Sequence, residues 1–313
     1  MILREVIRVK VGNFTKKFRS QLPLQLMVIP GVLFLIIFSY VPIYGLVIAF
    51  KSYSVTDTIS SADWVGLENF RIAFSDKFFW KSVVNTLAIS LLKLLIGFTF
   101  PIILSILIFE VKDGVFKKTV QTISYLPHFL SWIVVGGMLI SWLSTSGIFN
   151  ELLVLLGILD EPRNFMIEPK SYWLIAVLSD VWKEAGWGTI IYLATMSGID
   201  PTYYEAAKID GATKLQQIWH ITLPLMKFII SLMFILAVGG LLGSNLDQTL
   251  VLMNSLNQSH AEVINSYVYK IGLAQGDFSY ATAVGLAISI VSLILVIITN
   301  TVTKKMNDNR SVF

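Results

Sequence analysis

The chain alternates between long apolar runs and shorter polar segments. Six runs reach the roughly 20 residues that a helix needs to cross about 30 Å of hydrocarbon, and they cover residues 24–50, 83–109, 122–143, 172–194, 225–245 and 281–303. In hydrocarbon every backbone N–H and C=O group must find its partner within the protein, and a helix achieves this within one segment. The pattern therefore predicts an all-α polytopic membrane protein with six transmembrane helices.

The flanking segments orient these helices. An even number of crossings puts the basic segment 1–23 and the tail 304–313 on one side of a transmembrane domain that covers 24–303. Most of the 24 Lys and Arg residues lie on that side, and cytoplasmic flanks carry such an excess. We therefore expect both termini in the cytoplasm, and we read the net charge of +4 as a topology signal rather than as nucleic-acid binding.

Composition supports a membrane location and narrows the chemistry. Hydrophobic residues make up 55% of the chain and charged residues 14%, against roughly 45–50% and about 25% in soluble domains. The first apolar run is too long for a secretory signal and lacks a small-residue cleavage site, so we expect it to be retained. No cysteine is present, which excludes disulfides and Cys-ligated metals. The histidines, which we expect to be interfacial, have no metal-ligand spacing: His128, His220 and His260.

A polar stretch over residues 200–224 interrupts the apolar pattern. Asp200 can cap a helix whose first position is Pro201, and Gly211 can end that helix in the left-handed conformation. Thr213 and Gln216 have the spacing of a capping box for a second helix, which Pro224 is expected to break before the fifth apolar run. The stretch predicts two short helices at a tight corner, either a docking element or an ordinary re-entry loop.

The same stretch carries a family resemblance. Residues 205–224 resemble the EAA motif of permeases of binding-protein-dependent ABC importers, and they include Glu205-Ala206-Ala207, Asp210-Gly211-Ala212 and Ile221-x-Leu223-Pro224. Further segments are similar to the carbohydrate-uptake branch that imports oligosaccharides and polysaccharide fragments: Asn85-Thr86, Tyr125-Leu126-Pro127, Leu246-Asp247-Gln248 and residues 276–286.

The resemblance implies a type I ABC importer permease with a cytoplasmic coupling helix in the bacterial cytoplasmic (inner) membrane. Its implied partners are a second permease, two cytoplasmic ATPase subunits and an extracytoplasmic sugar-binding (lipo)protein. The residues implied to couple to the ATPase are Glu205, Ala206, Ala207, Asp210, Gly211 and Ala212. No GxxxxGK[ST] loop occurs, so ATP and Mg are expected on the partner ATPases. This chain is expected to bind no cofactor and to be a transport subunit rather than an enzyme.

A sugar pathway needs hydrogen-bonding groups and flat apolar surfaces within the spans. The candidates are Asp180, Trp182, Lys183, Glu184, Trp187, Tyr192 and Asn245. Asp180 and Lys183, three apart on one helix, can pair with each other, either as mutual neutralisation or as part of a substrate site. Lys93 could extend its stem towards an interface. We expect the glycines at 239, 240 and 243 to serve helix packing.

Three other functions are weighed against this one. An ABC importer of an amino acid or phosphonate would need a committed Arg near the midplane, and the six runs contain none. An ion-coupled secondary carrier would need inverted repeats and would leave the EAA-like stretch without a role. An enzyme would need a nucleophile, a base and an orienting group together, and none appear together in this sequence.

Overall fold

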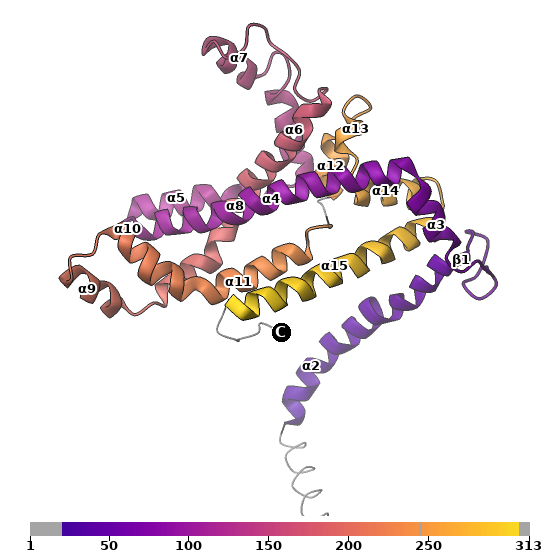
Figure 1. The fold of residues 1–313 in the computed structure, drawn as a ribbon, viewed down its shortest axis with the longest axis horizontal. Helices are drawn as coiled ribbons and strands as arrows, with labels where there is room; N and C mark the ends of the chain where they lie inside the picture. Colours follow the sequence, from indigo (N-terminus) through magenta and orange to yellow (C-terminus); the bar gives the residue numbers. More distant parts are fainter. Residues whose placement is uncertain (1–20, 244–245, 307–313) are drawn as a thin grey trace, which may run out of the picture.

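A computed structural model describes residues 21–243 and 246–306, and it is almost entirely helical. The main bundle consists of α4 (Lys77–Glu110), α5 (Val115–Tyr125), α6 (Trp132–Trp142), α8 (Tyr172–Ser197), α11 (Leu223–Gly239) and α15 (Phe278–Met306). Figure 1 shows α4 and α8 packed along each other, and α11 beside α15. The predicted all-α membrane fold is confirmed.

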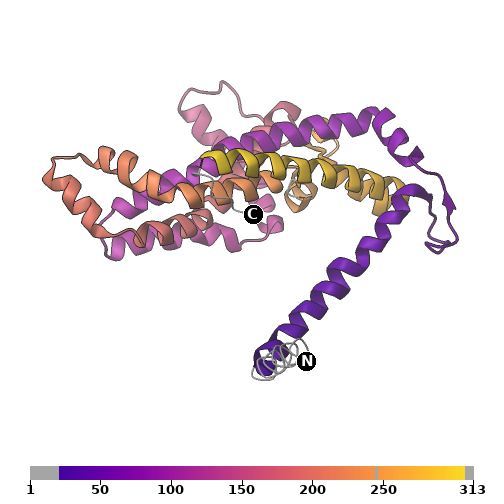
Figure 2. The same ribbon diagram turned by 60° about the horizontal axis from the view of Figure 1, so that its bottom comes forward.

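The N-terminal part of the first apolar segment stands apart from this bundle, whereas its C-terminal part packs on α15. It begins as α2 (Leu22–Leu35) and continues through a π-helical turn, η1 (Ile36–Tyr40), into the 3-10 helix η2 (Val41–Phe50). Figures 1 and 2 both show α2 leading away from the other helices. Its apolar side chains are exposed, with Met27 at 78%. Such a surface is suited to lipid or to another hydrophobic partner.

Among the described residues, length and apolar character qualify four helical segments to cross a membrane, or five if the bent pair α5–α6 is one span: Leu22–Phe50, Lys77–Glu110, Lys214–Gly239 and Phe278–Lys305. Helix α8 is 26 residues long but carries three charged residues, Asp180, Lys183 and Glu184. These charges are sheltered within the bundle, as intramembrane charges usually are.

The apolar run 122–143, predicted to be the third span, forms two helices with a bend between them rather than one straight helix. Helix α5 continues as the 3-10 turn η3 (Leu126–Phe129), and the chain then bends by 101° before α6 begins. Pro127 has no N–H for a helical bond, and Leu130 is extended. The Ser131 side chain then caps α6 by accepting a hydrogen bond from Val134 N–H.

Pro224 also behaves differently from the prediction. The helix does not break there, because α10 (Lys214–Gln217), a π-helical turn η5 (Ile218–Thr222) and α11 form one helical segment. The wider turn accommodates a proline ring that would otherwise crowd the preceding turn. The segment ends at Gly239, short of the predicted end at 245.

Several short elements lie outside the long helices, and some of them are at the end of the bundle opposite α9 (Pro201–Ile209) (Figure 1). The ribbon β1 (Lys51–Ser52) and β2 (Asp63–Trp64) is antiparallel and leads to α3 (Glu68–Ser75), the surface helix predicted over 67–74. The remaining elements are α7 (Ile148–Leu155), η4 (Pro169–Ser171), α12 (Leu246–Leu252), α13 (Gln258–Ala261), α14 (Ile264–Tyr269) and η6 (Lys270–Ala274).

Glycine lets two helices of the bundle approach closely. A Cβ atom at Gly186 of α8 would lie 1.8 Å from the backbone oxygen of Ser124 in α5. No side chain fits at position 186 without a shift of the backbone. Glycine at this position therefore allows α5 to pack closely against α8. A neighbouring close approach joins Gly188 to Pro101 of α4.

Candidate functional site: a charged cavity and a surface loop

A cavity of about 710 Å³ lies between α4, α8 and α11. Four predicted pathway residues line it, namely Asp180, Glu184, Trp187 and Tyr192. The first three follow at intervals of four and three residues, which places them along one face of α8. The volume is within the range of about 300–1,000 Å³ that is typical of small-molecule sites.

The other predicted pathway residues lie elsewhere. Trp182 faces a separate apolar groove between α6, α7 and α8, and Lys183 is buried behind the cavity wall at 5% exposure. Asn245 lies outside the described residues. Gly239 serves helix packing as predicted, since an added Cβ would lie 3.2 Å from Val296, but Gly240 and Gly243 line the cavity.

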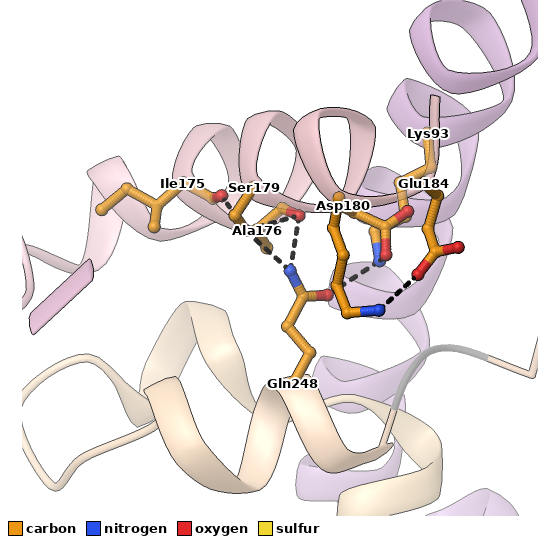
Figure 3. Close-up of polar contacts among 8 residues, drawn as sticks. Lys93, Ile175, Ala176, Ser179, Asp180, Glu184 and Gln248 are labelled. Atoms are coloured by element: carbon orange, nitrogen blue, oxygen red, sulfur yellow. Dashed lines mark hydrogen bonds and ion pairs between the residues drawn. The ribbon is translucent and has the colours of Figure 1, made fainter. Parts of the chain in front are cut away.

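Lys93 is the centre of the first charge network (Figure 3). Its Nζ lies 3.0 Å from Asp180 Oδ1 and donates to Gln248 Oε1 at 2.8 Å. Gln248 is held in turn, because its Nε2 donates to the Ala176 carbonyl at 2.7 Å and to Ser179 Oγ at 2.9 Å. The predicted pair of Asp180 with Lys183 is therefore wrong, and a lysine from another helix takes the place of Lys183.

Lys183 belongs to a second network. Its Nζ donates to Glu184 Oε1 at 2.8 Å and to the His128 carbonyl at 2.9 Å. His128 Nδ1 lies 2.6 Å from Glu184 Oε2, and the His128 ring stacks on Trp187 with centroids 4.4 Å apart. Both carboxylate oxygens of Glu184 are thus engaged, and the network fastens the bend after η3 to α8.

Sequence reasoning missed Lys93, Gln248 and His128 as members of the site. Lys93 was expected to extend towards an interface and His128 to be an ordinary interfacial residue, yet both reach acidic residues of α8. A signal was available for Lys93, since an intramembrane charge usually has a partner. That signal does not identify which acidic residue is the partner.

The N-terminal part of α4 is tied to α13 and to the chain that follows it. Asn85 Nδ2 donates to the backbone oxygens of Ser259 at 3.2 Å and Glu262 at 3.0 Å. Thr86 Oγ1 accepts a hydrogen bond from Ile264 N–H at 2.9 Å. Asn85 and Thr86 are buried, so these bonds fix the rim on the α14 side of the cavity.

The 200–224 loop has the predicted local form. Asp200 caps α9 by accepting from Thr202 N–H at 3.0 Å, and this hydrogen bond lowers the pKa of Asp200. Gly211 has φ of 78°, the left-handed conformation. The predicted capping box is present: Gln216 N–H donates to Thr213 Oγ1, and Thr213 N–H donates to Gln216 Oε1 at 2.7 Å.

One ion pair attaches this loop to the bundle, and two hydrogen bonds hold its own parts together. Lys214 Nζ lies 2.5 Å from Glu110 Oε2 at the end of α4. The Tyr204 hydroxyl is 3.0 Å from Thr222 Oγ1, which joins α9 to η5. The buried Gln217 Nε2 donates to the Ala212 carbonyl at 3.1 Å. These contacts join the two short helices to each other, to the start of the α11 segment and to the end of α4.

The predicted coupling residues lie at the surface of this loop. Glu205, Ala206, Asp210 and Gly211 are exposed, while Ala207 and Ala212 are half-buried. A shallow groove of about 300 Å³ lies beside Ala207, Asp210, Gly211 and Ala212. Apolar side chains project around it, with Ile209 87% exposed and Trp219 63% exposed. Exposed apolar groups rimmed by polar ones are typical of interaction sites.

Within the described residues, no group of three or more His, Asp or Glu side chains could hold a metal ion. The carboxylates near the cavity are instead matched with lysine or histidine. The arrangement can offer hydrogen bonds, a charge pair and an aromatic ring to a solute.

Comparisons with known proteins agree with this geometry. Residues 97–308 match the family described as "Binding-protein-dependent transport system inner membrane component". The chain is 42% identical over 293 residues to the polygalacturonan/rhamnogalacturonan transport system permease protein YteP of Bacillus subtilis (strain 168), covering 93% of this chain and 91% of that protein. It is 39% identical over 286 residues to Protein LplB of the same strain, covering 91% and 89%.

A solved structure is also similar. It is a bacterial ABC transporter involved in the import of the acidic polysaccharide alginate, and one of its chains superposes with a TM-score of 0.85 at 34% identity, covering 94% of this chain and 99% of that one. These relatives support the interpretation as a carbohydrate importer. They give no support to a non-sugar importer or to a secondary carrier. The chain belongs to the family of binding-protein-dependent transport system inner membrane components, as a carbohydrate permease subunit of an ABC importer.

Proposed function

We propose that this chain is one of two permease subunits of an importer that moves an oligosaccharide across the bacterial cytoplasmic membrane. The second permease, two ATPase subunits that bind ATP and Mg, and an extracytoplasmic sugar-binding protein complete the machine. Both termini and the 200–224 loop face the cytoplasm. A solved relative is described as an alginate ABC transporter in complex with a periplasmic protein that holds an alginate pentasaccharide, which supports a binding protein and an oligosaccharide as partners.

The form of the 200–224 loop carries this proposal. Two capped helices meet at a left-handed glycine, and Glu205, Ala206 and Asp210 are exposed beside them. Glu205 and Asp210 supply polar contacts to the ATPase, Gly211 sets the corner, and the small alanines allow close approach. Closure of the ATPases on ATP then shifts the loop, and rigid-body rocking exchanges inward for outward access to the cavity.

A matched pair of glycines tests the role of the loop. Gly211 has φ of 78° and Gly157, in the turn after α7, has φ of 68°, and neither has a neighbour within 4 Å of an added Cβ. We expect Gly211→Val to reduce ATP-dependent uptake at least tenfold, with membrane insertion unchanged. Gly157→Val carries the same backbone strain and is expected to leave uptake within twofold of wild type. Glu205→Ala is expected to behave like Gly211→Val.

The measurement is uptake into proteoliposomes that contain the complete transporter, normalised to the amount of this chain. Normal uptake by Gly211→Val and Glu205→Ala at matched protein levels would rule out coupling through the loop. Uptake that follows an ion gradient and ignores ATP would overturn the ABC mechanism itself.

The cavity supports an oligosaccharide as the solute. Sugars present hydroxyls on several sides and C–H faces that stack on aromatic rings. Trp187 lines the cavity and is 44% exposed. Trp182 is equally exposed but faces the separate groove. We expect Trp187→Ala to raise the KM for uptake about tenfold and Trp182→Ala to leave it unchanged. Equal effects of both substitutions would argue against sugar stacking in the cavity.

A further inference from the structure

Lys93 is a cation at the wall of the cavity between α4, α8 and α11. It lies near the middle of α4, lines the cavity, and has a side chain that is 17% exposed. Figure 3 shows its amine next to the Asp180 carboxylate and the Gln248 amide. A charge at this depth of a spanning helix is costly. A neutral sugar needs only hydrogen-bonding groups, which an amide or hydroxyl would supply at lower cost.

The second buried lysine shows what a structural role looks like. Lys183 has a side chain that is 7% exposed, does not line the cavity, and donates to the His128 carbonyl and to Glu184. Lys93 is different, because its amine borders the cavity and uses two of its three donors on acceptors among the described residues. A third donor is available for a solute.

The surroundings of Lys93 hold its ammonium in place. The Nε2 of Gln248 is committed to the Ala176 carbonyl and to Ser179 Oγ, so the Oε1 of the same amide is directed at Lys93. Asp180 holds the ammonium at the cavity wall through an ion pair, with Nζ 3.0 Å from Oδ1. The Asp180 side chain is itself 20% exposed, so an incoming anion can compete for the same ammonium.

We infer that Lys93 binds a carboxylate of the substrate, so that the transported oligosaccharide contains uronic acid residues. This inference rests on the proposed function. A lysine is a compact point charge on a flexible stem, whereas arginine grips a carboxylate through a rigid two-point fork. A point charge suits a carboxylate that must pass through the site rather than stay there. Relatives named for polygalacturonan and for an acidic polysaccharide are consistent with this substrate class.

The test compares oligosaccharides that carry free carboxylates with their uncharged methyl esters. Proteoliposomes with the complete transporter are given trigalacturonate or its methyl ester, and a mannuronate trisaccharide with its ester serves as a second pair. We expect Lys93→Gln to reduce uptake of the acids at least tenfold, while uptake of the esters stays within twofold of wild type. Lys93→Arg keeps the charge and is expected to restore most of the acid uptake. Asp180→Asn removes the competing carboxylate and is expected to lower the KM for the acids several-fold.

A second variant guards against misfolding. Lys93→Gln alone leaves Asp180 without its cation, so Lys93→Gln/Asp180→Asn removes both charges together. The double variant is expected to insert at wild-type levels and to lose the preference for acids over esters. An equal loss of acid and ester uptake in both variants would mean that Lys93 is structural, and would overturn the inference.

The remaining outcomes separate the inference from the proposed function. Wild-type uptake of the esters without the acids would overturn the uronate assignment and leave oligosaccharide import standing. Unchanged acid uptake by Lys93→Gln would do the same. Absence of uptake of all four oligosaccharides by the wild-type transporter would count against the proposed function, and the inference would fall with it.

Discussion

The cavity and the 200–224 loop are two polar regions of an apolar chain, and they satisfy their polar groups in opposite ways. In the loop, Asp200 bonds to the residue two positions on, and Thr213 bonds to the residue three positions on. In the cavity, Lys93 and Gln248 are 155 positions apart in the sequence, and His128 and Glu184 are 56 apart. The loop shapes itself from its own residues, whereas the cavity exists only when the helices have assembled.

The difference has a consequence for robustness. A lost cap in the loop exposes a backbone group that water can reach, so the cost is small. A lost partner in the cavity leaves a buried polar group or charge without a substitute, and the cost is larger. Substitutions that disturb helix packing should therefore damage the cavity and spare the form of the loop.

The largest effect is expected where α5 touches α8. Gly186→Ala places a Cβ against the Ser124 backbone oxygen, and overpacking of this kind costs about 1–3 kcal/mol or more. Gly137→Ala in α6 is the control, because no atom lies within 4 Å of its added Cβ and the gain in helix propensity is the same. Thermal unfolding in detergent should show a lower Tm for Gly186→Ala alone. Equal Tm values would mean that this contact does not hold the bundle together.

An intermediate effect is expected from one substitution made in both regions. Thr86→Val removes the acceptor for the buried Ile264 N–H, which costs about 1–3 kcal/mol. Thr213→Val removes the cap of α10 in an exposed position, which costs about 1 kcal/mol of local helix stability. Denaturant unfolding of the purified protein measures the first effect, and amide exchange of the loop measures the second. A larger global loss from Thr213→Val would contradict the contrast between the two regions.

The smallest effect is a pH dependence confined to the start of α9. Hydrogen bonding by Thr202 lowers the pKa of Asp200, so the contribution of this cap is fully present above the usual Asp value of about 3.9. It is lost as the pH falls through the lowered folded-state pKa. Amide exchange at Thr202 and Tyr203 should rise on acidification in the wild type. Asp200→Asn keeps a cap that does not titrate, and a similar rise in this variant would assign the effect to another group.

The same contrast explains how far the sequence could predict the molecule. The helix of α9, the left-handed Gly211 and the capping box depend on residues a few positions apart, so pattern reasoning located them. Surface helix α3 follows for the same reason. The coupling roles of Glu205 and its neighbours came from the family resemblance and stay a prediction.

Predictions failed where helices meet. The spacing of Asp180 and Lys183 permits an ion pair between them. In the folded chain α4 packs against α8, and Asp180 pairs with Lys93 of α4 instead. The bend after Pro127 does not follow from the apolar pattern, because the apolar content of a segment does not indicate the direction of its helix. Pro224 was read as a break, although the π-helical turn before it keeps the helix continuous. Each of these outcomes depends on contacts or backbone geometry that the local sequence pattern does not specify.

That continuity makes a single rod of residues 214–239, with one end in the surface loop and the other beside the cavity. At 1.5 Å per residue its 26 residues span about 39 Å. For a rod of that length, a tilt of about 10° about one end displaces the other end by about 7 Å. Gly240, Leu241 and Gly243 follow the tip of the rod and line the cavity. Under the proposed function, a small rotation of the 200–224 loop would therefore change the width of the solute path at the other end of the rod.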